Sequence, residues 1–396
     1  MYRNYFQNRR FRLVLLSLLL LLLPLLLWLR SCTEDEPPPV TPDTREPIGT
    51  LSGERLAWSG LPGWERDRQQ EAWPALLKNC RVMHKKPHWD RICQAAATLP
   101  APDQATARQF FEQNFIPYRL FSQEGREQGF MTGYYEPLLM GSYTRDERFR
   151  YPLYAPPKDM LTVELDSLFP ELKGKRVRGR LDGNRVIPYY PRAEIEVTDS
   201  PLAGQEILWV DNHADTFFLQ VQGSGRAQLP DGRIIGVGYA NQNGQPYVAI
   251  GKTLMDWGEV EPGKVNLFVL REWLRNHPDR AQALMNTNPS YVFFNLRDEV
   301  ADGPTGSLNV PLTAERSIAI DRKAIELGSL MYVDSTYPIG DKAPLQKLVF
   351  AQDTGGAIRG DLRADFFFGT GEQAEQWAGT MKQDTRFYLL KPKVQQ

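Results

Sequence analysis

The chain has 396 residues, with 47 lysines and arginines against 48 aspartates and glutamates, and a formal net charge of −1. No run of basic residues occurs beyond the extreme N-terminus. The charge therefore excludes the electrostatic attraction on which nucleic-acid binding depends, and we expect no nucleic-acid partner. The length is typical of two globular domains with an ample hydrophobic core.

Residues 1–32 have the pattern of a targeting segment. Four arginines precede seventeen mostly apolar residues that end at Leu29. This order is typical of a signal peptide, and a helix of about 25 Å is borderline for a membrane span. The following Arg30-Ser31-Cys32 is similar to the end of a bacterial lipoprotein signal, in which the cysteine is acylated, although Arg30 fits poorly. Acylation of Cys32, an uncleaved anchor and plain secretion stay open, and each places the remaining chain outside the cytoplasm.

A tether and a helical region come next. Residues 33–47 are rich in proline and acidic residues, which is typical of a linker, so we expect residues 33–58 to have no packed structure. Between residues 60 and 130, apolar residues recur three and four positions apart, and this spacing predicts several helices.

Two further cysteines, Cys80 and Cys93, flank two histidines, His84 and His88. Cysteine and histidine at such spacing are candidate zinc ligands, but Pro87 would break the helix that brings them to one face. Outside the cytoplasm, a Cys80–Cys93 disulfide is the simpler interpretation, with two buried free thiols as the alternative. The sequence contains no HExxH and no paired CxxC, so we expect neither a metal nor a cofactor.

Short β-rich runs occupy residues 130–250 and are separated by Gly, Pro, Asn and Asp. Residues 216–225 (TFFLQVQGSG) alternate in type and are predicted to form a strand, with Gln220 and Gln222 on one face, where they could line a groove. Residues 246–287 have helical periodicity, and strand patterns return from residue 290. Strands and helices do not alternate one by one, so we expect a mainly β core with peripheral helices rather than a doubly wound sheet.

The stretch VFAQDTGGAIRGDLRADFFFGTG, residues 349–371, contains three aspartates. Asp353 opens an Asp-Thr-Gly triplet, as in aspartic proteases, where two such loops supply two carboxylates that share one proton. This chain has one triplet, so only a homodimer could complete the pair. Alternatively, Asp353 shapes a turn at Gly355 and Gly356, where the backbone can adopt φ > 0.

The other two aspartates have different surroundings. Asp361 lies in a second predicted turn and is expected to be exposed, whereas Asp365 begins a strand and is flanked by Ala364 and three phenylalanines. Apolar surroundings raise the pKa of a carboxyl group, which can then act as a general acid near neutral pH. An ion pair with Arg359 or Arg363 would instead lower the pKa of Asp365, and spacing alone leaves both interpretations open.

Several motifs occur in a fixed order along the chain. They are residues 132–137 (TGYYEP), 218–225 (FLQVQGSG), 288–294 (NPSYVFF), 317–321 (SIAID), 327–328 (LG), 351–360 (AQDTGGAIRG) and 364–366 (ADF). Together they resemble the membrane-bound lytic murein transglycosylase A family, from about residue 60 to residue 390. The C-terminal motifs resemble the three-aspartate domain of that family, and its three aspartates correspond to Asp321, Asp353 and Asp365.

The resemblance implies a double-psi β-barrel, related to those of expansins and barwin, with a smaller β domain inserted into it. The barrel would comprise residues 59–144 and 289–393, with the three-aspartate part at residues 310–390, and the insertion residues 145–288. The family cleaves the β-1,4 bond between N-acetylmuramic acid and N-acetylglucosamine in peptidoglycan and releases a 1,6-anhydro product. One carboxyl group, carried over to Asp365, would act as general acid and then base, with Asp353 and Asp321 in support.

Other motif residues are candidates for binding the glycan. Aromatic rings could stack on sugars, and hydroxyl, amide and glycine backbone groups could approach glycan hydroxyl and acetamido groups. Barrel core is the alternative for the two tyrosines, and a hairpin turn for the glycines at 223 and 225. Glu136 is a weaker candidate for a second carboxylate, because Pro137 constrains its backbone. The substrate-binding candidates are Thr132, Tyr134, Tyr135, Gln220, Gln222, Gly223, Ser224, Gly355 and Gly356.

Three other functions stay open: an expansin-like protein that binds peptidoglycan without cleaving it, a hydrolase that uses Asp365 with Glu136, and the dimeric protease. For the favoured transglycosylase we expect a monomer that binds peptidoglycan glycan strands, with no cofactor. We expect it to be membrane-anchored in the periplasm, as an outer-membrane lipoprotein or, alternatively, through an inner-membrane anchor. Cell-wall synthases are candidate protein partners.

Overall fold

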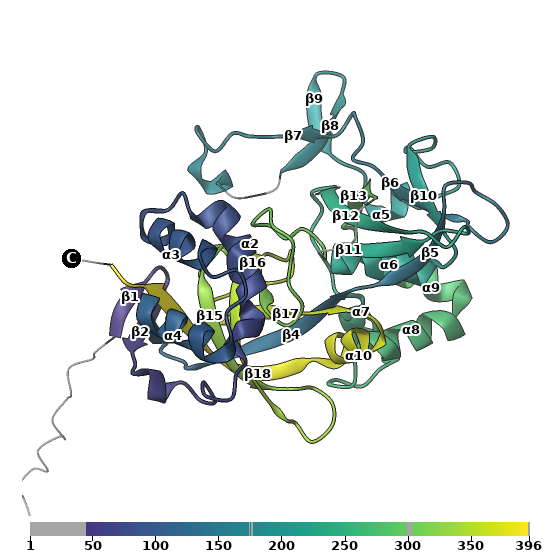
Figure 1. Cartoon of the computed structure of the whole chain (residues 1–396). Coiled ribbons are helices and arrows are strands. Elements are labelled where there is room, and N and C mark those ends of the chain that lie inside the picture. Colours follow the sequence, from purple (N-terminus) through teal and green to yellow (C-terminus); the bar gives the residue numbers. More distant parts are fainter. Residues whose placement is uncertain (1–44, 174, 176, 299–302, 395–396) are drawn as a thin grey trace, which may run out of the picture. The chain divides into compact units, whose positions relative to one another are not determined.

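The computed structural model describes residues 45–173, 175, 177–298 and 303–394. The predicted targeting segment, with Cys32, and the first part of the predicted tether lie outside these residues. Within the described ranges, no helix is long and apolar enough to cross a membrane. From Arg45 onward the chain forms one compact unit that contains three sheets, and helices lie beside the two larger ones (Figure 1).

The bounds of the elements are as follows. The strands are β1 Arg45–Ile48, β2 Leu51–Arg55, β3 Phe115–Phe121, β4 Gln128–Glu136, β5 Leu138–Ser142, β6 Tyr151–Tyr154, β7 Leu161–Thr162, β8 Arg178–Asp182, β9 Arg185–Pro188, β10 Glu206–Val210, β11 Ser224–Gln228, β12 Ile234–Gln242, β13 Val292–Arg297, β14 Ser317–Ile320, β15 Leu330–Thr336, β16 Pro344–Asp353, β17 Arg363–Thr370 and β18 Lys382–Pro392. The helices are α2 Trp73–Met83, α3 Pro87–Ala97, α4 Gln104–Asn114, α5 Arg192–Ile195, α6 His213–Gln222, α7 Ile250–Asp256, α8 Leu267–Asn276, α9 Pro278–Asn286 and α10 Glu372–Thr380.

Six strands close into a barrel, so the predicted mainly β architecture is confirmed. Their order is β4-β17-β14-β16-β15-β18, and β18 pairs with β4 to complete the circle. β17 is parallel to β4 and β14 is parallel to β16, whereas the other neighbours are antiparallel. Successive residues of β15 alternate between two hydrophobic clusters, because side chains alternate across a strand. Leu330 and Tyr332 pack with α2–α4, and Met331 and Val333 pack with α6–α10.

The prediction of a tether without packed structure is wrong for its C-terminal part. β1 and β2 form a hairpin, β2 pairs with β3, and β3 pairs with β18 of the barrel. Leu51 is buried, and Lys391 of β18 donates a hydrogen bond to Glu46 at 2.5 Å. A free strand edge offers unpaired backbone groups to any short extended segment, so this pairing does not depend on a strong sequence pattern.

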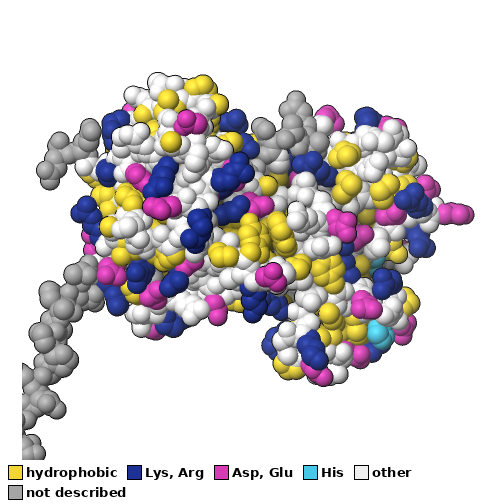
Figure 2. Space-filling model, turned by 60° about the horizontal axis from the view of Figure 1, so that its bottom comes forward, with side chains coloured by type: hydrophobic (Ala, Val, Ile, Leu, Met, Phe, Trp, Pro, Cys, Tyr) yellow, Lys and Arg dark blue, Asp and Glu magenta, His cyan; other side chains and the backbone are white. Residues whose placement is uncertain are grey.

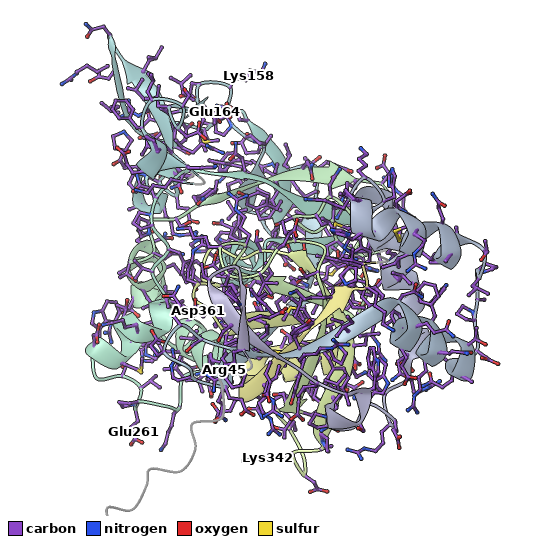
Figure 3. The ribbon with its side chains drawn as sticks, turned by 90° about the vertical axis from the view of Figure 1, so that its left-hand side faces the viewer. Arg45, Lys158, Glu164, Glu261, Lys342 and Asp361 are labelled. Carbon is purple, nitrogen blue, oxygen red and sulfur yellow. A yellow bond between two sulfur atoms is a disulfide. The ribbon has the colours of Figure 1, made fainter. Side chains whose placement is uncertain are left out.

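A second sheet has the order β13-β12-β11-β5-β10-β6, and a third contains β7, β8 and β9. The second sheet includes β5 and β13, so it extends beyond the predicted insertion at both ends. Figure 1 shows this sheet at the right and the small third sheet at the top. In Figure 3, Lys158 and Glu164 lie beside the third sheet, and Lys342 lies at the tip of the loop between β15 and β16 at the other end.

The predicted N-terminal helical region contains α2, α3 and α4, although β3 occupies its last part. Cys80 of α2 and Cys93 of α3 form a disulfide. Pro87 begins α3 and so separates the two helices, as its lack of a backbone N–H dictates. His84 contacts the carbonyl oxygen of Cys80, and nowhere in the described residues do three or more His, Cys, Asp or Glu side chains form a group able to hold a metal.

The predicted strand at residues 216–225 is wrong, because most of this segment belongs to helix α6. The Asn212 side chain caps the helix start by accepting a hydrogen bond from the backbone N–H of Asp215 at 3.2 Å. Gly223 ends the helix with a φ of 83°. Five consecutive residues, from Thr216 to Gln220, are buried, and burial on all sides hides the helical period in the sequence.

Candidate active site

Asp365 is held between two neighbouring strands of the barrel. It faces Ala319 of β14 on one side and Thr132 of the parallel strand β4 on the other. The Thr132 hydroxyl donates a hydrogen bond to Oδ1 of Asp365 at 2.6 Å, and Nη2 of Arg363 donates one to the Thr132 hydroxyl at 2.8 Å. The fold thus joins the catalytic candidate to a binding candidate 233 residues away in the sequence.

Burial raises the pKa of Asp365 to about 6, and the negative charge of Asp353 contributes to the rise. The hydrogen bond from Thr132 and the positive charge of Arg363 act in the opposite direction without cancelling burial. Arg363 donates to Thr132 and to the carbonyl oxygen of Ala364, and Arg359 donates to the carbonyl oxygen of Ile358. Of the two interpretations left open, the structure therefore favours a carboxyl group that can hold a proton close to neutral pH.

Asp353 ends β16 and connects three segments of the chain. Its Oδ1 accepts hydrogen bonds from the backbone N–H and the hydroxyl of Ser307, both at 2.9 Å, and its Oδ2 accepts one from the Tyr134 hydroxyl at 3.2 Å. Burial raises the pKa of Asp353, while these hydrogen bonds lower it. The expected φ > 0 is absent at both Gly355 and Gly356. A Cβ on Gly355 would come within 2.7 Å of Ile358, so close packing is the reason for glycine there.

Asp321 and Asp361 lie in the chain segments that flank Asp365. Asp321 is buried, and it accepts hydrogen bonds from the backbone N–H groups of Lys323 and Gly360, both at 3.1 Å. It therefore orders the turn that leads into β17. Asp361 was expected to be exposed but is half-buried, and it accepts a hydrogen bond from the backbone N–H of Gln123 at 3.0 Å.

Tyr134 and Tyr135 are successive residues of β4 and point to opposite faces of the strand. The Tyr134 ring packs against Phe367 beside the aspartates. The Tyr135 ring lies in the core with the helices, and its hydroxyl donates a hydrogen bond to Glu375 of α10 at 2.8 Å. The two residues are only 7% and 3% exposed, so the prediction that sugars stack on their rings is wrong and the core alternative applies to both.

Gln220 and Gln222 do not line one face of a strand, since they lie in the last turn of α6. Gln220 Oε1 accepts a hydrogen bond from the buried Arg192 at 2.7 Å, while its Nε2 has no protein partner among the described residues. Gln222 Oε1 accepts one from the backbone N–H of Tyr135 at 3.2 Å. Gly223 caps the helix rather than forming a hairpin turn, and Ser224, the first residue of β11, is half-buried.

Glu136, the second candidate carboxylate, is ion-paired. Its Oε2 accepts a hydrogen bond from Nε of Arg226 at 2.8 Å, and the two side chains are 2% and 24% exposed. Burial raises the pKa of Glu136, and the pairing with Arg226 opposes the rise. A carboxylate that is already paired in this way is poorly placed to activate a water molecule.

Sequence reasoning missed Tyr247, which precedes α7 in a segment predicted to be helical. The backbone before and after it is fixed by two buried asparagines. Asn243 donates to the carbonyl oxygens of Tyr190 and Pro289, both at 2.9 Å, and Asn288 accepts from the backbone N–H of Val248 at 3.0 Å. Desolvation raises the pKa of Tyr247; the charge of Arg192 opposes the rise and the charge of Asp365 adds to it, although 41% of the residue stays exposed. The Asn-Gly turn at residues 243–244 was the only sequence signal that the chain is not helical just before Tyr247.

Comparison with known proteins finds two matching regions. Residues 130–295 match the MltA specific insert domain, and residues 316–391 match the 3D domain. Membrane-bound lytic murein transglycosylase A of Escherichia coli K12 is 32% identical over 269 residues, which cover 66% of this chain and 65% of that protein. The alignment thus spans slightly less than two thirds of this curated relative.

Solved structures show the same similarity over more of the chain. The structure of MltA from Neisseria gonorrhoeae in its monoclinic form is 31% identical, with a TM-score of 0.78, and the match covers 89% of this chain and 96% of that one. The lytic transglycosylase LtgG of Burkholderia pseudomallei is 40% identical, with a TM-score of 0.60, over 88% of this chain and 98% of that one.

Proposed function

The chain belongs to the membrane-bound lytic murein transglycosylase A family, and from this premise we propose that it is a lytic transglycosylase of peptidoglycan. The enzyme cleaves the β-1,4 bond between N-acetylmuramic acid and N-acetylglucosamine and forms 1,6-anhydromuropeptides. The observation that carries this proposal is the carboxyl group of Asp365, which has a pKa of about 6 and lies beside Thr132. The ion pair between Glu136 and Arg226 supports a reaction that uses one carboxyl group rather than two.

The reaction proceeds in two linked steps at this carboxyl group. Protonated Asp365 donates its proton to the glycosidic oxygen as the bond between that oxygen and C1 of N-acetylmuramic acid breaks. The C6 hydroxyl oxygen of the same sugar then forms a bond to C1, and its proton passes to the Asp365 carboxylate, which restores the acid. A pKa near the working pH allows one group to serve as acid and base, and the intramolecular attack gains from proximity.

The neighbouring residues have supporting roles in this proposal. Asp353 raises the pKa of Asp365 through its charge, and Asp321 orders the turn before β17. Ser224, Gly355 and Gly356 are not fully buried and remain candidates for glycan contact. To these we add the exposed face of Tyr247 as a surface on which a sugar ring stacks.

The finer points of architecture and location are also proposals. The closed barrel of six strands, with two parallel pairs, supports the double-psi topology. The name of the curated relative, a membrane-bound enzyme, supports attachment through residues 1–32, with acylated Cys32 in the periplasm. Figure 2 shows acidic and basic side chains intermixed over one face, in keeping with a protein that does not bind nucleic acid. A monomer that cooperates with cell-wall synthases completes the proposal.

Mass spectrometry of purified peptidoglycan digested with the full chain tests the activity. We expect muropeptides lighter than hydrolysis products by one water, and none from Asp365→Asn. Asp361→Asn, which changes a half-buried aspartate of the same stretch, is the matched control and should leave the products unchanged. Hydrated reducing ends would instead indicate a hydrolase, and tight binding without cleavage by the unaltered chain would indicate an expansin-like protein.

A further inference from the structure

The hydrogen bonds around Thr132 have a defined direction. A guanidinium group has five N–H donors and no acceptor, so the contact between Arg363 and Thr132 at 2.8 Å can only run from nitrogen to the hydroxyl oxygen. The hydroxyl has a single hydrogen, and the remaining close oxygen is Oδ1 of Asp365 at 2.6 Å. With the Asp365 carboxylate as acceptor, the Thr132 hydrogen points to Oδ1, and the donor from Arg363 favours this orientation of the hydroxyl.

We propose that Arg363 is a positioning residue that determines, through Thr132, which oxygen of Asp365 carries the acid proton; this rests on the proposed role of Asp365 as the general acid. Because Oδ1 already accepts a hydrogen bond from Thr132, the proton of the neutral carboxyl group resides on Oδ2. In the described part of the chain, no protein hydrogen bond reaches Oδ2. The proton on Oδ2 is therefore free to reach a glycosidic oxygen.

The guanidinium group itself is held in place. Another of its nitrogens, Nη1, donates to the carbonyl oxygen of Ala364, and its Cζ lies 5.1 Å from the centre of the Phe130 ring. Burial lowers the pKa of Arg363, and the charge of Asp365 opposes this change, but a guanidinium group stays charged at any pH that the protein tolerates. Arg363 thus donates to Thr132 both before and after the proton leaves Asp365.

Without this donor, the Thr132 hydroxyl can turn and accept a hydrogen bond from Asp365. The acid proton would then sit on Oδ1, between two protein groups, where it cannot reach the leaving oxygen. Removal of Arg363 also removes a positive charge, which raises the pKa of Asp365. The charged or titratable groups near Asp365 are Arg363, Asp353, Tyr134 and Tyr247. Of these, Arg363 is the cation, so its replacement is expected to shift the pH dependence of kcat to higher pH.

The test compares full-length Arg363→Met, Arg363→Lys and Arg359→Met with the unaltered chain. Arg359 is exposed and donates to the carbonyl oxygen of Ile358, so its replacement controls for loss of an arginine from the same stretch of the chain that does not contact Thr132. We measure kcat and KM for release of anhydromuropeptides from purified peptidoglycan between pH 4.5 and 8.5, together with the thermal unfolding midpoint. Arg363→Met should lower kcat about 10- to 100-fold, keep KM within about twofold and raise the upper pH limit by about half a unit. Arg363→Lys, which keeps a charged donor, should recover much of kcat, and Arg359→Met should behave as the unaltered chain.

Other outcomes overturn the proposal. A raised KM with unchanged kcat in Arg363→Met would make Arg363 a substrate contact, and equal losses in the Met and Lys variants with lowered unfolding midpoints would make it structural. If Arg363→Met does not fold, Arg363→Gln, which keeps a donor but no charge, should retain most of kcat and still show the shifted pH limit. Absence of anhydro products from the unaltered chain would refute the proposed function instead, and activity of Asp365→Asn would refute the role of Asp365, so the failures are distinguishable.

Discussion

The hydroxyl of Tyr134 donates a hydrogen bond to Oδ2 of Asp353 at 3.2 Å, and this contact connects β4 to the Asp-Thr-Gly segment at the end of β16. Both groups are largely enclosed by protein, where a carboxylate that loses a donor is costly. Tyr134→Phe should therefore lower the free energy of unfolding by about 1–2 kcal/mol. Urea denaturation measures this change, with Tyr143→Phe as control because Tyr143 is 53% exposed. An unaltered denaturation midpoint in Tyr134→Phe would mean that the contact contributes nothing to stability.

Asp365→Asn should make the protein more stable at pH 7.5 but not at pH 4. Folding raises the pKa of Asp365 from 3.8 to about 6, so the folded state holds the proton more tightly than the unfolded chain. Stability from this group is therefore greatest below pH 4 and is lost as the pH rises to 6. Asparagine does not ionise, so Asp365→Asn avoids this loss of unfolding free energy. The expected gain is about 1–3 kcal/mol for a pKa shift of about two units in a partly screened group.

Urea denaturation at the two pH values checks the effect of Asp365→Asn. The control is Asp361→Asn, which removes a carboxylate that accepts a backbone hydrogen bond and should bring no gain. The same gain at pH 4 and pH 7.5 would contradict the raised pKa of Asp365.

The ion pair between Glu136 and Arg226 should matter for stability and not for chemistry. Arg226→Met leaves a buried carboxylate without a partner and should lower the free energy of unfolding by about 3–5 kcal/mol. Addition of Glu136→Gln to Arg226→Met should recover part of this loss, because no charge then remains buried. Glu136→Gln alone should still form anhydromuropeptides. Loss of anhydromuropeptides in that variant, at an unchanged unfolding midpoint, would show that Glu136 takes part in the reaction.

Removal of the disulfide should destabilise the helical region next to the barrel. Cys80 and Cys93 are 13 residues apart in sequence and tie α2 to α3. Replacement of both by alanine should lower the free energy of unfolding by about 3 kcal/mol, the value expected for a short loop. Thermal unfolding of the oxidised protein, the reduced protein and the double variant measures this, and the last two should agree. Identical unfolding midpoints in all three would show that the disulfide adds no stability.

Much of the fold could be predicted because most strands are short β-rich runs separated by turn residues. The sequences of β15, β16, β17 and β18 are such runs. Helices α8 and α9 could be predicted for a different reason, because apolar residues there recur with helical periodicity. Helix α6 could not be recognised, because residues buried on every side carry no period, and its end signals are two single residues, Asn212 and Gly223. The β1–β2 hairpin was missed because its partner edge exists only in the folded protein.

The candidate site could be predicted in its chemistry but not in its contacts. The phenylalanines after Asp365 indicated an apolar environment, and its pKa is indeed raised. Whether Arg363 pairs with Asp365 or with Thr132 depends on the register between β17 and β4, which no local pattern reveals. Likewise, the opposite directions of Tyr134 and Tyr135 follow from strand alternation, but which face is the core depends on helices much later in the chain.

The pairing of β4 with both β17 and β18 makes the finished site a property of the complete chain. Thr132 lies 233 residues before Asp365, and the strand that closes the barrel ends at Pro392, close to the C-terminus. Contacts over such separations form late, because the intervening chain must first be brought together. We therefore expect a chain that lacks β18 to leave the contact between Thr132 and Asp365 unformed. For the proposed peptidoglycan-cleaving enzyme, we therefore expect activity to appear only after β18 closes the barrel, and proteolytic loss of β18 to abolish it.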